Sequence, residues 1–205
     1  MTIWGKAEPC QERYRWNGAI VAIAASTGGV EAIERILAEF PPDCPPTLIV
    51  QHMRGGITPL FADRLDRHVL PRVVEARDAM PVLQGQVYIA PADDHHLTIV
   101  AGRPPLCRLS EGPLVNGHRP SADVLFRSLA RCDGARIVGV ILTGMGDDGA
   151  KGLLNLRQKG MHTIGQDESS ALIYGMPKAA ADLGAVEQAL PLGRIAGRIL
   201  KLCQC

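Results

Sequence analysis

The chain has 205 residues, of which 46% are hydrophobic and only 4% aromatic, and it carries 22 Lys and Arg against 21 Asp and Glu. This length and apolar content allow one sizeable domain with an aliphatic core. The balanced charge argues against a general nucleic-acid or membrane-surface binder, which would normally show a basic excess. Because no apolar run approaches the ~20 residues of a membrane span, we expect a protein that is not inserted in a membrane.

The beginning of the chain predicts no secretory signal, because residues 1–18 are polar and contain no apolar core. We interpret residues 1–18 as a polar leader or linker remnant and residues 19–205 as one domain. The cysteines are scattered without a C-x-x-C pair, which is typical of reduced thiols in a cytoplasmic protein. The C-terminal Cys203-Gln204-Cys205 could bind a metal, but a frayed tail is the favoured interpretation.

Short β-branched runs alternate with helical patterns along residues 19–205, which indicates βαβ units and a mainly parallel sheet. Thr58 is predicted as the N-cap of a helix with Pro59 at its first position, and Ser121 as the N-cap of another. Between these helices, four β-rich runs separated by Pro and Gly predict hairpins or an antiparallel edge. The predicted strands are 19–25, 47–51, 72–76, 86–90, 96–100, 106–110, 136–144 and 161–166. The predicted helices are 30–40, 58–68, 121–131, 150–159 and one starting at 176.

Three predicted strands end in residues that can react. Ser26 follows the first strand, His52 the second, and Asp147 and Asp148 follow the strand at 136–144. In an open parallel sheet, sites form in the crevice beyond the carboxyl ends of the strands. A serine hydroxyl needs a base to become nucleophilic, a histidine can serve as that base, and a carboxylate can orient the histidine. These positions therefore predict a serine hydrolase site.

Ser26 itself is open to several interpretations. The sequence Ala24-Ala25-Ser26-Thr27-Gly28 differs by one residue from the nucleophile pattern G-x-S-x-G. The glycines could instead form an anion-binding loop, although neither the P-loop lysine nor the dinucleotide glycines are present. Ser26 could also be an ordinary helix cap, His52 a structural histidine and "MGDDG" a solvated turn.

Six segments together resemble the catalytic domain of the CheB family of chemotaxis-receptor methylesterases. They occur in the family's order, and the resemblance extends from about residue 19 to about residue 200. The segments are "ASTGG" at 25–29, "QHM" at 51–53, "YIAP" at 88–91, "HRPSADVLF" at 118–126, "GVILTGMGDDGA" at 139–150 and "GMPKAA" at 175–180.

The resemblance implies a three-layer, doubly wound α/β domain with a mainly parallel central sheet. It also implies hydrolysis of glutamate γ-methyl esters on the cytoplasmic helices of methyl-accepting chemoreceptors, and deamidation of certain receptor glutamines, without a cofactor or metal. By motif, the nucleophile is Ser26, the base His52 and the acid Asp148, whereas Asp147 occupies a variable position. The backbone N–H of Met145 matches the family's oxyanion donor.

Further residues are candidates for the same site. Thr27 and Gly28 are additional oxyanion donors, and His95 and Arg119 could line the substrate cleft. The cluster "DDHH" at 93–96 is interpreted as a turn rather than a metal site, because adjacent residues of an extended segment point to opposite faces. About 18 residues before the first strand are too few for the receiver domain usual in the family, so we expect an open active site that does not respond to phosphodonors.

Two other classes of function compete with the esterase. The chain could be a non-catalytic module of the same fold that docks on receptors or signalling partners. It could also be a nucleotide-binding regulator that uses "STGG" as an anion loop. Labelling by a fluorophosphonate serine probe would favour the esterase, and a nucleotide-dependent melting temperature would favour the regulator.

Overall fold

The computed structural model describes residues 14–92 and 94–205. Its strands are Ile20–Ala25 (β1), Thr47–Gln51 (β2), Arg72–Glu75 (β3), Gln86–Ile89 (β4), His96–Val100 (β5), Leu106–Ser110 (β6), Ile137–Ile141 (β7), His162–Gln166 (β8) and Gln188–Leu190 (β9). Its helices are Gly29–Leu37 (α1), Thr58–His68 (α2), Ala122–Ala130 (α3), Ala150–Gln158 (α4), Met176–Asp182 (α5) and Leu192–Leu202 (α6). Strands and helices alternate over most of the chain, as the sequence pattern predicts.

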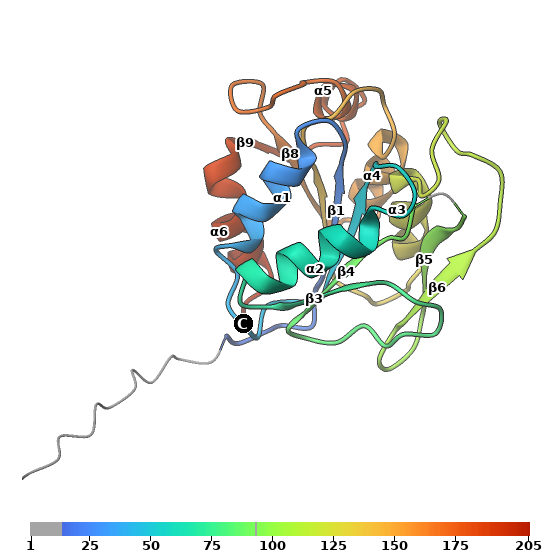
Figure 1. Ribbon diagram of the computed structural model, residues 1–205. Coiled ribbons are helices and arrows are strands. Elements are labelled where there is room, and N and C mark those ends of the chain that lie inside the picture. The colour runs from blue at the N-terminus through green and yellow to red at the C-terminus, as the bar shows by residue number, and fades with distance from the viewer. Residues whose placement is uncertain (1–13, 93) are drawn as a thin grey trace, which may run out of the picture.

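A seven-stranded sheet forms the centre of the domain, in the order β3-β4-β2-β1-β7-β8-β9 (Figure 1). All of its strand pairs are parallel. Every residue of β1 is buried, because this strand lies in the middle of the sheet with helices on both sides. A continuous apolar run such as "IVAIAA" is typical of such a strand, since both of its faces need apolar side chains.

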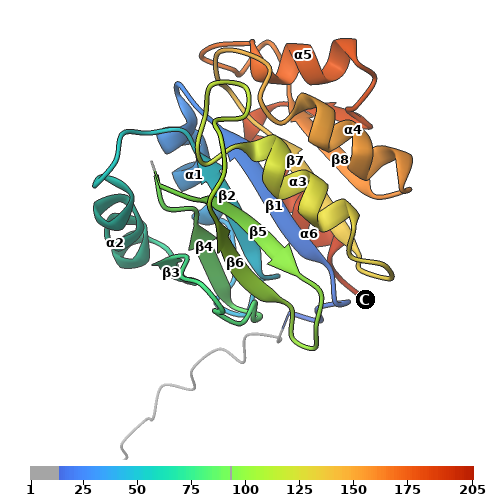
Figure 2. The same ribbon diagram turned by 90° about the vertical axis from the view of Figure 1, so that its right-hand side faces the viewer.

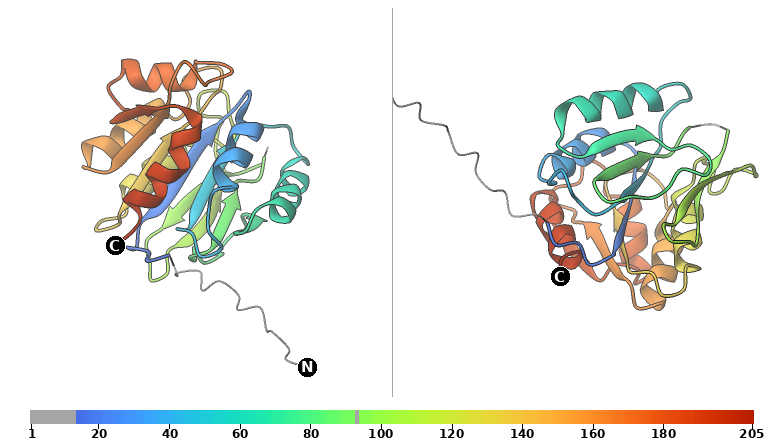
Figure 3. Two further views of the ribbon diagram at one scale, coloured as in Figure 1. Left: turned by 90° about the vertical axis from the view of Figure 1, so that its left-hand side faces the viewer. Right: turned by 90° about the horizontal axis from the view of Figure 1, so that it is seen from below.

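Helices cover both faces of the sheet. On one face α3, α4 and α5 pack with the β5–β6 hairpin (Figure 2). On the other face α1, α2 and α6 cover the strands (Figure 3). These two apolar layers confirm the predicted three-layer, doubly wound α/β architecture.

The predicted β-rich middle divides between two sheets. β5 and β6 form the expected antiparallel hairpin, as a separate two-stranded sheet. β3 and β4, in contrast, join the main sheet in parallel, with β3 at its edge. The short strand β9 at the opposite edge had no counterpart among the predicted strands.

The starts of two helices differ from the prediction. Ile57, not Thr58, is the N-cap of α2, so Pro59 is the second helical residue rather than the first. The Thr58 hydroxyl donates to a carboxylate oxygen of Glu75. Ser121 does occupy the N-cap position of α3, but its hydroxyl makes no capping hydrogen bond. It donates instead to Asp148.

The two ends of the described chain pack against each other. The Tyr14 hydroxyl donates to the Leu200 carbonyl over 2.6 Å, and the Asn17 amide donates to the Leu202 carbonyl over 2.9 Å. Residues 14–17, placed in the expected leader, therefore contact the end of α6. The prediction of a frayed C-terminal tail is wrong for Cys203, which is completely buried. In the described ranges no helix is both long and apolar enough to cross a membrane.

Candidate active site

The ends of β1, β2 and β7 bring Ser26 and His52 close together in space. Ala25 and Gln51 are paired across β1 and β2, so Ser26 and His52 are the next residues of two neighbouring strands. The backbone N–H of His52 donates to the Ala25 carbonyl, and that of Ser26 donates to the Thr143 carbonyl, each over 3.0 Å. The serine turn is thus fixed between the strands on either side of β1.

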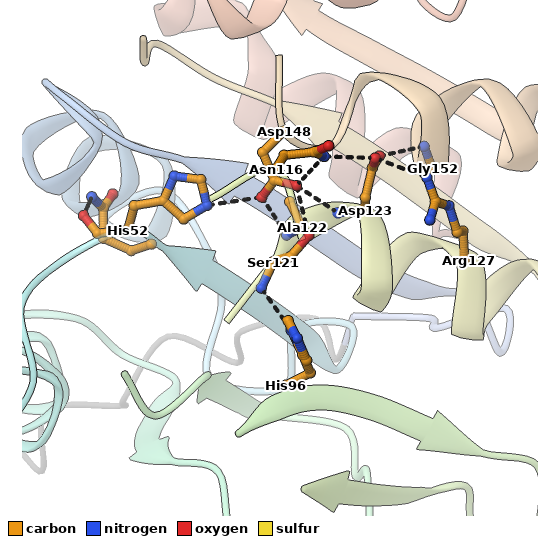
Figure 4. Close-up of polar contacts among 10 residues, drawn as sticks. His52, His96, Asn116, Ser121, Ala122, Asp123, Arg127, Asp148 and Gly152 are labelled. Atoms are coloured by element: carbon orange, nitrogen blue, oxygen red, sulfur yellow. Dashed lines mark hydrogen bonds and ion pairs between the residues drawn. The ribbon is translucent and has the colours of Figure 1, made fainter. Parts of the chain in front are cut away.

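Asp148 lies beyond the end of β7 and binds the imidazole of His52. The distance from His52 Nε2 to Asp148 Oδ2 is 2.9 Å, and the side chains are 8% and 1% exposed (Figure 4). The other ring nitrogen, His52 Nδ1, is buried and has no hydrogen-bond partner among the described residues. With the Nε2 proton held by the carboxylate, Nδ1 is the nitrogen available to accept a proton.

The Asp148 carboxylate accepts hydrogen bonds on both oxygens. Oδ1 accepts from the Ser121 hydroxyl (2.6 Å), the Asn116 amide (2.9 Å) and, more weakly, the Asp123 backbone (3.4 Å). Oδ2 accepts from the Ala122 backbone (2.7 Å) as well as from His52. Burial alone would raise the pKa of Asp148, but the hydrogen bonds from His52, Ser121, Asn116 and Ala122 outweigh it and lower the pKa to about 2.

The N-terminus of α3 contributes directly to this charge stabilisation. Ala122 and Asp123 are its first two residues, and their N–H groups have no partner within the helix. A carboxylate placed there satisfies these groups and interacts favourably with the helix dipole. Asp148 therefore remains ionised at neutral pH although it is almost completely buried.

A second imidazole lies against the first. The rings of His52 and His118 are parallel to within 6°, with centroids 3.7 Å apart. Burial lowers the pKa of His118, and the electrostatic interaction with His52 lowers it further, whereas Asp148 and Asp147 raise it. The net lowering favours a neutral His118 ring packed on the face of His52.

A pocket of about 160 Å³ opens beside these rings, lined by His52, Met53, Leu114, Gly117, His118, Arg119 and Pro120. Arg119, predicted in the substrate cleft, is thus part of its wall, and it donates to the Gly112 carbonyl over 2.7 Å. His95, predicted in the same cleft, is half-buried and not among the lining residues. Larger pockets of about 570 and 750 Å³ lie at the amino ends of the strands, away from the reactive side chains.

The predicted oxyanion donors lie in the loops around Ser26. Thr27 is exposed, Gly28 has a φ of 80° and caps α1, and the Met145 side chain is 74% exposed. Across residues 14–92 and 94–205, no acceptor is bound to the backbone N–H of these three residues. These donors are therefore available to an anionic oxygen.

The two neighbouring aspartates at the end of β7 differ strongly. Asp148 is buried whereas Asp147 is exposed. In the cluster "DDHH", Asp93 lies outside the described residues and Asp94 is exposed, while His96 is buried. The His96 ring accepts from the Ser121 backbone N–H over 3.1 Å and contacts the Pro113 carbonyl at 2.9 Å, so it supports the start of α3.

Besides His118, whose ring packs on His52, sequence reasoning missed three side chains of the site. Asn116 and the Ser121 hydroxyl bind Asp148, and the Gln51 amide donates to the carbonyls of both Ser26 and His52 over 2.9 Å. No sequence spacing indicates these contacts. Most of them join residues that are far apart in the sequence, and the remaining one joins Gln51 to its direct neighbour His52. Gln51 and Ser121 do stand inside the quoted segments "QHM" and "HRPSADVLF".

A doubly wound α/β domain with a serine, a histidine and a carboxylate at its strand ends has the architecture of a serine-type hydrolase. A family model described as CheB methylesterase matches residues 21–199. The chain belongs to this family.

Known relatives agree with that assignment. A protein-glutamate methylesterase/protein-glutamine glutaminase of Agrobacterium fabrum is 52% identical over 189 residues, covering 92% of this chain and 54% of the relative. One of Caulobacter vibrioides is 52% identical over 186 residues, covering 91% and 54%. The chain thus spans about half the length of these curated relatives.

A solved structure has the same fold over nearly its whole length. The crystal structure of the Thermotoga maritima CheB methylesterase catalytic domain matches with a TM-score of 0.87 at 34% identity. The match covers 91% of this chain and 99% of that one. The similarity therefore extends over most of this chain.

Proposed function

We propose that this chain is a serine-type protein-glutamate methylesterase that hydrolyses glutamate γ-methyl esters and releases methanol. The observation that carries the proposal is the arrangement of His52. Asp148 binds its Nε2 at 2.9 Å, and its buried Nδ1 has no partner in the described parts of the chain. An oriented base with a free nitrogen, beside a serine at the next strand end, is the requirement for activating a hydroxyl.

The first half of the reaction forms an acyl-enzyme. His52 Nδ1 accepts the proton of the Ser26 hydroxyl while Oγ attacks the ester carbonyl carbon, and Asp148 stabilises the resulting imidazolium. The carbonyl oxygen becomes an oxyanion that backbone N–H groups bind, with Met145 as the first candidate and Thr27 and Gly28 beside it. The imidazolium then donates its proton to the leaving methoxide, which departs as methanol.

The second half regenerates the enzyme. Water gives a proton to His52 and attacks the acyl carbon. The Ser26 oxygen then leaves and takes that proton from His52. The product is the free glutamate side chain. The same steps with a glutamine substrate release ammonia instead of methanol, so we also propose deamidation, which agrees with the double activity in the names of the relatives.

We propose the cytoplasmic helices of methyl-accepting chemoreceptors as the substrate, and the cytoplasm as the place of action. Around the site, Leu114, Met145 and Leu172 are 60%, 74% and 71% exposed. Leu114 lines the pocket beside His52, and the Leu172 side chain lies against Gly28. Exposed apolar side chains gathered around one site, unlike single scattered ones, are typical of a contact for another protein. They support a protein substrate rather than a small ester.

The test is methanol release from receptor membranes carrying radiolabelled methyl esters. We expect Ser26→Ala to abolish release, Asp148→Asn to reduce it severely, and Asp147→Asn, the exposed neighbour, to leave most of it. A fluorophosphonate probe should label the wild type and not Ser26→Ala. A wild-type protein that binds the membranes but releases no methanol and takes no label would be a docking module. Equal losses at the two aspartates would overturn the assignment of Asp148.

A further inference from the structure

The turn at residues 115–118 places two side chains on the catalytic pair. Val115 and His118 exchange backbone hydrogen bonds of 3.0 and 2.9 Å, and the residues between them, Asn116 and Gly117, have φ angles of 52° and 80°. An Asn-Gly pair is favoured in such a two-residue turn, because both residues tolerate the left-handed region. The backbone thus explains an asparagine here without assigning any task to its side chain.

The side chain of Asn116 nevertheless makes two hydrogen bonds that the turn does not require. Its amide nitrogen lies 2.9 Å from Asp148 Oδ1 and 2.9 Å from Asp123 Oδ2 (Figure 4). An amide has two N–H groups, so each carboxylate receives one. Asp148 and Asp123 are both buried, whereas Asn116 is exposed, and the amide therefore lies where two buried carboxylates approach the surface.

Of the two carboxylates that the Asn116 amide binds, that of Asp123 is held by further contacts. Its Oδ1 accepts the Gly152 backbone N–H of α4 over 2.6 Å, and its Oδ2 also pairs with Arg127 over 3.0 Å. Asp123 is thereby tied to two helices, so the amide that it binds has a defined place. Together with the Ser121 hydroxyl, the amide holds Oδ1 of Asp148, and Oδ2 faces His52 Nε2 and the Ala122 backbone N–H.

We propose that Asn116 is a positioning residue that fixes the orientation of the Asp148 carboxylate, and through it the ring of His52, against the framework of α3 and α4. This inference rests on the proposed esterase activity for its kinetic test. It assigns to Asn116 no contact with the substrate. Its loss should therefore reduce kcat and leave KM nearly unchanged.

Two substitutions keep the backbone of the turn. Asn116→Gly removes the amide, and glycine accepts the positive φ without strain. Asn116→Asp keeps the shape and also tolerates that φ, but it replaces the donor with a third carboxylate beside two others. We expect kcat to fall about tenfold for Asn116→Gly and about a hundredfold for Asn116→Asp, with KM within about twofold of the wild type. Asn155→Asp, which adds the same charge at an exposed position of α4, should change neither constant.

A double-mutant cycle separates positioning from a general structural effect. If Asn116 acts through the Asp148 carboxylate, adding Asn116→Gly to Asp148→Asn should cost less than about twofold further. Residual activity of the Asp148→Asn background is measured with radiolabelled ester over long incubations. An unchanged kcat in Asn116→Gly, or the same tenfold loss in both backgrounds, would overturn the proposal.

A spectroscopic measurement tests the positioning without turnover. The proton between His52 Nε2 and Asp148 should give a downfield proton NMR signal in the wild type and in Asn155→Asp. It should shift or broaden in Asn116→Gly, and disappear in Asp148→Asn. If the wild type proves inactive, the proposed function fails while this measurement still decides the role of Asn116. An identical signal in wild type and Asn116→Gly refutes that role, and melting curves of both proteins verify that the variant is folded.

Discussion

Replacing Asp148 with asparagine should remove a specific part of the pH dependence of folding stability. In the folded chain, hydrogen bonds lower the pKa of this carboxyl from 3.8 to about 2 in spite of its burial. A group whose pKa is lower in the folded state stabilises the fold above its unfolded pKa, and this stabilisation disappears as the pH falls toward the folded pKa. Asp148 therefore stabilises the protein at neutral pH and loses its effect between about pH 4 and about pH 2.

The magnitude follows from the two pKa values. A difference between 3.8 and about 2 corresponds to a free energy of unfolding of about 2 kcal/mol at neutral pH. At about pH 3, between the two values, roughly 1 kcal/mol of this remains. These free energies come from the ionisation of the Asp148 carboxyl alone. An asparagine at this position does not ionise in this pH range, so the variant lacks this contribution.

The assay is urea unfolding of the wild type and Asp148→Asn at about pH 6 and about pH 3. The variant also loses hydrogen bonds, which lowers its free energy of unfolding at both pH values. This pH-independent loss cancels when the difference between wild type and variant at about pH 6 is compared with the difference at about pH 3. We expect the stability gap between the proteins to be about 1 kcal/mol smaller at the lower pH. Asp147→Asn, whose carboxyl is exposed, should show no such change. Parallel stability curves for wild type and Asp148→Asn would refute the reasoning.

Three further outcomes are expected. Ser26→Ala and His52→Ala should each abolish most esterase activity, and the double variant should be little worse, because the two residues act as a unit. A loss in the double variant equal to the product of the two single losses would contradict this. In the wild type, kcat/KM should rise with pH and then level off, since the base must be neutral, and a flat profile would exclude this role. Gly152→Ala should destabilise by about 1–3 kcal/mol in thermal unfolding, because a Cβ there would lie 2.7 Å from Phe126 Cβ. Gly197→Ala, with nothing within 4 Å, should instead stabilise α6 by up to about 1 kcal/mol, and equal effects at the two glycines would refute the packing argument.

The fold was predictable from the sequence because its main signals are local. Continuous apolar runs such as the one in β1 indicate strands buried on both faces, and the helical spacing between them indicates crossovers. The sheet to which β3 and β4 belong was less predictable. A strand of four residues has the same pattern of apolar residues in an antiparallel hairpin as at the edge of a parallel sheet. Only tertiary packing determines which of the two sheets it joins.

The site was predictable only where it follows strand ends. Ser26 and His52 come directly after β1 and β2, so the rule for parallel sheets places them together. The choice between Asp147 and Asp148 depended on family resemblance, because the sequence does not reveal which side chain points inward. The structure separates them, because Asp147 is exposed whereas Asp148 is 1% exposed and binds His52 Nε2.

Two side-chain donors to Asp148, Asn116 and Ser121, could not be predicted, because a stronger local explanation exists for each of them. Asn116 precedes a glycine in a tight turn, and Ser121 precedes a helix, where serine is a common cap. Both residues occupy those local positions, yet their side chains donate to a carboxylate that follows them by 32 and 27 residues. Local rules account for the backbone in these cases and not for the side chain.

Two buried glutamines explain how the turn at Ser26, which contains few large side chains, keeps its shape. Parallel strands provide no ladder partners beyond their last residue, so the loops that follow need other hydrogen bonds. Gln51 at the end of β2 donates to the carbonyls of Ser26 and His52. Gln166 at the end of β8 accepts the Thr143 backbone N–H over 2.8 Å, and the Thr143 carbonyl accepts that of Ser26. The backbone of the serine turn is therefore fixed from both sides by neighbouring strands, which leaves the residues around the hydroxyl free to be small.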